Sequence, residues 1–178
     1  MYSIDQRGFG RSGGRRVLIE NAKQVYDDQW LLIFEVLKKC NVNQQTTPLF
    51  LSGRSNGALI ATNMAGSFLG QKLFRAVSLL TPFYHLYNTD SYKLLWKIKL
   101  VHKVAPHFEI HVPTTEYSEE FKQKWKWYYS FNMSYDQVTP TYVLTAMEMQ
   151  EQALSDMGSI KVPVLMAEAD EDKVVCGE

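Results

Sequence analysis

Apolar residues recur along this chain with two periods, which predict helices and strands in alternation. Between residues 21 and 40 they fall three or four positions apart, as on one face of a helix. Short apolar runs closed by glycine, proline or threonine are typical of buried strands. We therefore expect helices over about 21–40, 56–69 and 139–157, and strands over 2–5, 49–52, 74–80 and 162–168.

This alternation predicts an α/β protein with a mainly parallel sheet flanked by helices that cover both of its faces. The alternation stops between residues 84 and 138, where thirteen aromatic residues and all four histidines are found. The sequence therefore divides into a core built from residues 1–83 and 139–178 and an inserted segment, 84–138.

The strongest candidate for chemistry is Gly53-Arg54-Ser55-Asn56-Gly57, between an apolar run and a helix of small residues. In a G-x-S-x-G pattern a strand ends, the chain turns sharply and a helix begins, so the serine projects from the sheet edge. Ser55 is therefore the candidate nucleophile, and the backbone N–H of Asn56 is the candidate oxyanion donor. Side chains at Gly53 and Gly57 are expected to collide with the neighbouring strand and helix. In the alternative interpretation Ser55 is an ordinary helix cap.

Two further motifs stand in a fixed order around Ser55. D-x-R-G-x-G-x-S begins at Asp5, and residues 161–175 read KVPVLMAEADEDKVV. This order resembles that of the α/β-hydrolase superfamily, and within it the lysophospholipase and monoacylglycerol lipase group, often labelled serine-aminopeptidase-like. The resemblance covers essentially the whole chain. It departs at Arg54, where His, Trp or Tyr is more usual, and at Ala58, where a second glycine is common.

The resemblance implies a partial α/β-hydrolase fold in which residues 84–138 form a helical cap over the nucleophile. It also implies a catalytic acid just ahead of a pair of β-branched residues, here Val174 and Val175, which selects Asp172. That carboxylate would hold a histidine in the right tautomer. Asp170 is the alternative acid, and a solvated acidic turn is the third interpretation of this loop.

The order Ser, acid, His requires a histidine after Asp172, and residues 173–178 contain none. The four histidines precede the acid and lie in the predicted cap: His85, His102, His107 and His111. The strand and turn that supply the second oxyanion donor should precede residue 1. We therefore expect the chain to be part of a longer protein, with the catalytic histidine and part of the oxyanion hole missing from it, and to be poorly stable alone.

The composition of the chain argues against several other classes of function. A net charge of +0 and a pI of about 6.9 indicate no attraction to nucleic acid. Cys40 and Cys176 lie far apart without metal-ligand spacing and are expected to be reduced and structural. We expect no metal and no cofactor. Neither a long apolar run nor a signal-peptide core is present, which favours a cytoplasmic protein.

The segment 93–104, KLLWKIKLVHKV, predicts an amphipathic helix within the cap. Four apolar residues share one side and three lysines fall elsewhere (Leu94, Leu95, Ile98 and Val101; Lys93, Lys97 and Lys103). This pattern favours a cap helix with a solvated face. The alternative is peripheral contact of this helix with an anionic membrane.

Together these features predict a serine ester hydrolase of the lysophospholipase or monoacylglycerol lipase type, with a small-molecule lipid ester as its substrate. Two alternatives stay open: a non-catalytic remnant of such a hydrolase, and an aminopeptidase or other acyl hydrolase on the same fold. An aromatic, uncharged cap favours a lipid over a substrate with a free amine.

Overall fold

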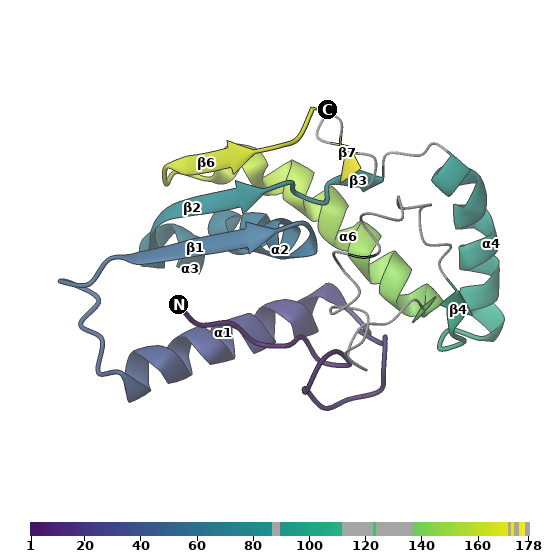
Figure 1. Cartoon of the computed structure of the whole chain (residues 1–178), viewed down its shortest axis with the longest axis horizontal. Coiled ribbons are helices and arrows are strands. Elements are labelled where there is room, and N and C mark those ends of the chain that lie inside the picture. The colour runs from purple at the N-terminus through teal and green to yellow at the C-terminus, as the bar shows by residue number, and fades with distance from the viewer. Residues whose placement is uncertain (87–89, 112–122, 124–136, 171, 173–174, 177–178) are drawn as a thin grey trace.

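The computed structural model describes residues 1–86, 90–111, 123, 137–170, 172 and 175–176 (Figure 1). Its helices are α1 (Ala22–Lys39), α2 (Asn56–Gly66), α3 (Phe68–Leu73), α4 (Asp90–Val104), α6 (Pro140–Asp156) and the 3-10 turn η1 (Met157–Ser159). Its strands are β1 (Leu49–Arg54), β2 (Phe74–Leu80), β3 (His85–Leu86), β4 (Ile110–His111), β5 (Gln137–Val138), β6 (Val164–Ala167) and β7 (Val175–Cys176). Much of the predicted cap, and Glu171 and Val174 of the acidic loop, lie outside the described residues.

The central sheet is parallel, with its strands in the order β1-β2-β6. Leu51 pairs with Val77, which pairs in turn with Val164, so the carboxyl ends of all three strands share one edge of the sheet (Figure 1). The predicted parallel sheet flanked by helices is therefore confirmed.

The prediction of a strand over residues 2–5 was wrong. Within the described residues this segment pairs with no strand, and it runs along α1 rather than beside β1 (Figure 1). An extended segment becomes a strand only when it lies against a free sheet edge, because its N–H and C=O groups need partners. The pattern of apolar residues gives no information on that partner.

The helices begin where the sequence offers a capping side chain. Asn21 precedes α1 and accepts a hydrogen bond from the Gln24 N–H, and Thr139 precedes α6 with Pro140 in the first turn. The single helix predicted over 56–69 is instead two helices, α2 and α3. Ser67 separates them because its extended backbone (φ −67°, ψ 152°) ends α2 while its side chain caps α3.

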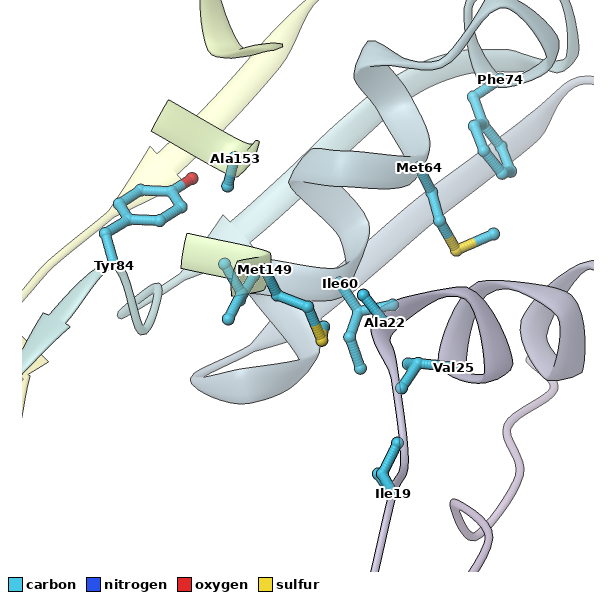
Figure 2. Close-up of a cluster of buried hydrophobic side chains, with 10 residues drawn as sticks. Ile19, Ala22, Val25, Ile60, Met64, Phe74, Tyr84, Met149 and Ala153 are labelled. Atoms are coloured by element: carbon cyan, nitrogen blue, oxygen red, sulfur yellow. The ribbon is translucent and has the colours of Figure 1, made fainter. Parts of the chain in front are cut away.

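The main core lies where three helices meet the sheet. The helix α2 packs on β1 and β2, and α6 packs on α2. Figure 2 shows the buried side chains that converge there from the segment before α1, from α1, α2 and α6, and from β2 and the loop after it: Ile19, Ala22, Val25, Ile60, Met64, Met149, Ala153, Phe74 and Tyr84. A second cluster joins the alanines of α2 to Val77 and Leu79 of β2. Small residues on α2 thus let it approach the sheet closely.

The opposite face of the sheet is apolar and open. Phe50 is 68% exposed and Leu165 is 66% exposed, and the strand register puts both side chains on the face opposite to Val77 and Leu79. Their exposure shows that no described part of the chain covers this face. The prediction that helices cover both faces of the sheet therefore holds for one face only in the described part of the chain.

None of the described helices combines the length and the apolar character needed to cross a membrane.

Two tyrosines in or beside the core provide a matched test of its polar contacts. The buried Tyr84 hydroxyl lies 2.7 Å from the Thr62 Oγ1, which itself donates to the Ala58 carbonyl. The Tyr26 hydroxyl is also buried, but it has no hydrogen-bond partner within the described residues. Tyr84→Phe is expected to lower the free energy of unfolding by about 1 kcal/mol, whereas Tyr26→Phe should leave it unchanged or raise it.

Urea unfolding measures both changes, and its pH dependence adds a second readout. Burial raises the pKa of both phenols above the ordinary value. Their contribution to stability is therefore fully present below pH about 10 and is lost as the pH rises through the folded-state pKa. As the pH rises above about 10, the free energy of unfolding of each Tyr→Phe variant should therefore fall less than that of the natural chain. Equal losses in the two variants at neutral pH would contradict the prediction.

Candidate active site

The predicted nucleophile lies on a sharp turn between β1 and α2. Ser55 has φ 52° and ψ −121°, a backbone conformation that costs a non-glycine residue about 1–3 kcal/mol. Four hydrogen bonds hold it there. Its N–H donates to the Leu80 carbonyl at 2.9 Å, and its carbonyl accepts from the N–H groups of Ala58, Leu59 and Phe83. The strained turn is therefore fixed by β2 and by the first turn of α2.

The side chain of Ser55 does not cap the helix that it precedes. The residues before α1, α3 and α6 (Asn21, Ser67 and Thr139) each accept a hydrogen bond from the N–H three positions later. Ser55 occupies the same position before α2 and makes no such bond. The interpretation of Ser55 as an ordinary helix cap is therefore wrong, and its hydroxyl is not used by the helix.

The two glycines of the motif differ in their surroundings. A Cβ at Gly53 would meet the Gly57 carbonyl and the Ala58 nitrogen, which are backbone atoms and cannot move away easily. A Cβ at Gly57 would meet nothing within 4 Å in the described structure. The predicted collision is confirmed at Gly53 and is wrong at Gly57, because Gly57 lies on the open side of the first helical turn.

The neighbours of Ser55 provide a positive charge and a backbone N–H at the start of a helix. Asn56 is the first residue of α2, and the first N–H groups of a helix have no partner within it. The helix dipole makes that end favourable for an anion. Arg54 is exposed at the end of β1, paired in register with Leu80, and no ion pair within the described part of the chain uses it.

The acidic loop follows β6 and reaches the same edge of the sheet as Ser55. Two consecutive residues at the end of β2 link the two segments, since the Leu80 carbonyl accepts from Ser55 and the Thr81 N–H donates to the Ala167 carbonyl at 2.7 Å. Asp172 is half-buried and its N–H donates to the Ala169 carbonyl in a turn. Asp170, the alternative acid, is exposed.

One of the four histidines lies on a strand that pairs with the segment following the acidic loop. β3 and β7 pair antiparallel, with His85 opposite Cys176 and Leu86 opposite Val175, so His85 is adjacent in the ladder to the strand that follows Asp172. His102 lies on α4, His107 follows it, and His111 lies on β4. That none of the four is the catalytic base stays a prediction.

Sequence reasoning missed a second strained residue at this edge. Thr81, directly after β2, has φ 42°, and its N–H makes the bond to the end of β6. Strained residues gather at functional sites more often than elsewhere. The only signal was the dipeptide Thr81-Pro82 closing an apolar strand, which indicates a turn without indicating its conformation.

The other motif, D-x-R-G-x-G-x-S, forms a loop that is held by its own hydrogen bonds and by an ion pair to α1. The Asp5 carboxylate accepts from the Arg11 N–H at 2.8 Å, and the Ser12 hydroxyl donates to the Asp5 carbonyl. Arg7 makes a two-bond ion pair with Asp28 on α1, with both distances 2.7 Å. An open groove of about 690 Å³ lies between this loop and α1, and Ser55 is not among its lining residues.

Comparison with protein families decides the affiliation. The model of the family described as Serine aminopeptidase, S33 matches residues 1–178. The chain belongs to this family. This family member departs from the usual motif at Ala58, which is fully buried in the cluster against Val77 and Leu79. A methyl group therefore fits where a second glycine is common.

Solved structures share the fold of this serine aminopeptidase family member. A monoacylglycerol lipase from Paleococcus ferrophilus is 17% identical, with a TM-score of 0.70 over 90% of this chain and 58% of its own. A soluble variant of monoglyceride lipase from Saccharomyces cerevisiae, in complex with a substrate analog, is 18% identical, with a TM-score of 0.75 over 97% of this chain and 60% of its own. A carboxyl esterase from Bacillus coagulans is 11% identical, with a TM-score of 0.61 over 92% and 70%.

The α/β-hydrolase fold is thereby confirmed, and the chain spans about three fifths of the length of the two lipases. A comparison with curated protein sequences found no significant match.

Proposed function

We propose that this chain is part of a serine hydrolase that cleaves the ester of a single-chain lipid, such as a lysophospholipid or a monoacylglycerol. One observation carries the proposal: Ser55 is held in a strained turn at the sheet edge with its hydroxyl unused by the helix behind it. A strained turn that serves no capping role is typical of a nucleophile. The likeness to two monoacylglycerol lipases supports an ester substrate.

In the proposed reaction the Ser55 Oγ attacks the ester carbonyl while a histidine takes its proton. The Asn56 N–H stabilises one side of the oxyanion. The same histidine then returns the proton to the departing alcohol, and water hydrolyses the acyl-serine to a fatty acid. Asp172 orients the histidine. We propose that this histidine, and the second oxyanion donor, belong to parts of the whole protein outside the 178 residues.

A lipid ester partitions into membranes, so we also propose that the cap makes peripheral contact with a membrane.

Fluorophosphonate labelling tests the nucleophile and the acid together. In the full-length protein the reagent is expected to form a bond between its phosphorus and the Ser55 Oγ, with loss of fluoride, which peptide mass spectrometry locates. Asp172→Asn should slow labelling by about 10³- to 10⁴-fold, because the histidine then adopts the wrong tautomer. Asp170→Asn is the matched control, since this exposed carboxylate lies in the same loop, and it should leave the rate unchanged.

The outcomes separate the competing functions. An unlabelled Ser55 in a folded full-length protein would reject the hydrolase and favour a non-catalytic remnant. Slow labelling in Asp170→Asn, with a normal rate in Asp172→Asn, would make Asp170 the catalytic acid in place of Asp172. Labelled protein that cleaves aminoacyl amides but not lipid esters would replace the lipase with an aminopeptidase.

A further inference from the structure

The peptide unit after Ser55 carries the proposed oxyanion donor. Its two polar groups are the Ser55 carbonyl and the Asn56 N–H, which point in opposite directions because the peptide is planar and trans. Whatever fixes the carbonyl therefore also fixes the direction of the N–H. The carbonyl accepts from the N–H groups of Ala58 and Leu59, at 2.9 and 3.1 Å, and of Phe83, at 3.3 Å. The first two bonds come from α2 itself, and the third reaches the peptide from another part of the chain.

The third bond comes from a short segment that directly follows β2. We call residues 81–84 the β2 strap. At its first residue, the Thr81 N–H donates to the Ala167 carbonyl at the end of β6, at 2.7 Å. At its last residue, the buried Tyr84 hydroxyl lies 2.7 Å from the Thr62 Oγ1 on α2. The β2 strap is therefore held at both ends, and Phe83 lies between these two attachments.

A side chain of α6 holds the middle of the β2 strap. Gln150 is half-buried, and its Nε2 donates to the Phe83 carbonyl at 3.0 Å. Phe83 thus donates to Ser55 through its N–H while its own carbonyl is held by Gln150. A continuous path of hydrogen bonds therefore leads from α6 through Phe83 to the peptide that carries the oxyanion donor.

The position of Gln150 is set because α6 is tied to other segments of the chain. The carbonyl of the neighbouring Met149 accepts from the Asn63 Nδ2 on α2 at 3.0 Å, and Figure 2 shows the Met149 side chain inside the main core. In the first turn of α6, the N–H and the Oγ1 of Thr141 both donate to the Pro106 carbonyl, at 3.3 and 2.8 Å. The Gln150 amide is therefore presented to the β2 strap from a fixed helix.

We infer that Gln150 is a positioning residue for the oxyanion donor of the proposed reaction. It acts through Phe83 on the peptide between Ser55 and Asn56, and so on the direction of the Asn56 N–H. A carbonyl that accepts hydrogen bonds also polarises its peptide, which makes the N–H of the same peptide a stronger donor. The negative oxygen develops in the transition state, so the effect belongs to kcat rather than to KM. The inference rests on the proposed function, because it needs Ser55 to attack a carbonyl.

The kinetics of Gln150→Met in the full-length protein test the inference. Methionine is close to glutamine in size but cannot donate a hydrogen bond, so the contact with Phe83 is lost with little change in shape. For hydrolysis of a monoacylglycerol, kcat per fluorophosphonate-titrated site should fall about tenfold with KM unchanged, which is part of the about 10²- to 10³-fold cost of removing a whole oxyanion donor. Gln150→Glu should lower kcat further, because its carboxylate repels the Phe83 carbonyl.

Gln152→Met is the matched control, since Gln152 is an exposed glutamine of the same helix that reaches only Asp156, at 3.4 Å. It should keep the natural kcat. Two further readouts separate positioning from a purely structural role. An alkyl boronic acid forms a tetrahedral, anionic adduct with the nucleophilic serine and should bind Gln150→Met about tenfold more weakly. Amide hydrogen exchange should be faster at Phe83 in this variant, whether or not the protein turns over substrate.

The outcomes distinguish this inference from the proposed function. Equal kcat and equal boronic acid binding in Gln150→Met and the natural protein, with Ser55 labelled in both, would overturn the inference and leave the proposed function intact. A lower Tm or faster exchange at Phe83, without a change in kcat, would overturn it as well, because the contact would then only stabilise the fold. A raised KM with an unchanged kcat would assign Gln150 to substrate binding instead. Absence of labelling at Ser55 in the folded natural protein would reject the proposed function, and the inference with it.

Discussion

Replacing Ser55 with alanine is expected to lower kcat/KM for a monoacylglycerol ester by about 10⁴-fold in the full-length protein. The substitution removes the attacking oxygen and leaves the oxyanion donor and the substrate contacts in place. Steady-state hydrolysis of a monoacylglycerol and of a short-chain ester measures the effect. Ser52→Ala is the matched control, since Ser52 is an exposed serine three positions earlier on β1, and it should keep full activity.

The strain at Ser55 gives the same prediction a thermodynamic readout. Ser55→Gly should also abolish activity, but it should raise the free energy of unfolding by about 1 kcal/mol relative to Ser55→Ala, because glycine adopts φ 52° without strain. Retained turnover in Ser55→Ala would contradict the nucleophile. Equal stability of the two variants would show that the turn stores no strain.

Gly53→Ala is expected to lower the free energy of unfolding by about 3 kcal/mol and to abolish activity, whereas Gly57→Ala should be tolerated. The new Cβ at residue 53 would press against the Gly57 carbonyl and the Ala58 nitrogen, so β1 and α2 must separate. At Gly57 the space is open, and alanine in the first turn of a helix is favoured over glycine by up to about 1 kcal/mol. Urea unfolding measures both variants.

Each of these two variants is the control for the other, since both glycines belong to one motif and both receive one methyl group. A large loss of stability in Gly57→Ala, measured in the full-length protein, would show that another segment lies against this residue. A small effect of Gly53→Ala would mean that β1 and α2 can separate at this turn with little loss of stability.

The spacing of apolar residues predicted most of the main helices and strands, because an element that buries one side must place apolar residues at its own period. The strand over 74–80 and the helices beginning at Ala22 and Pro140 follow from apolar spacing and capping residues. The break at Ser67 was missed because a serine inside an apolar helical pattern does not show whether it continues one helix or caps the next. The ladders β3-β7 and β4-β5 were missed because strands of two residues have no periodicity and join segments far apart in sequence.

The candidate site was predictable in its residues and less so in its geometry. The pattern around Ser55 identified the turn, but the strain at Thr81 depends on how β2 meets β6, which no local pattern encodes. In α4 apolar residues lie on two sides of the helix: Ile98 and Val101 are half-buried, whereas Trp96 and Leu100 are exposed. The sequence could not show which of them would face the protein, because that depends on the position of α6.

The turn after α4 is held through atoms that do not depend on its own side chains. The Pro106 carbonyl accepts from Thr141 and the His107 carbonyl accepts from the Arg15 guanidinium, and every amino acid provides a carbonyl. Substitutions at residues 106 and 107 should therefore leave both attachments available, whereas the side of α4 that packs against α6 has to keep a matching shape.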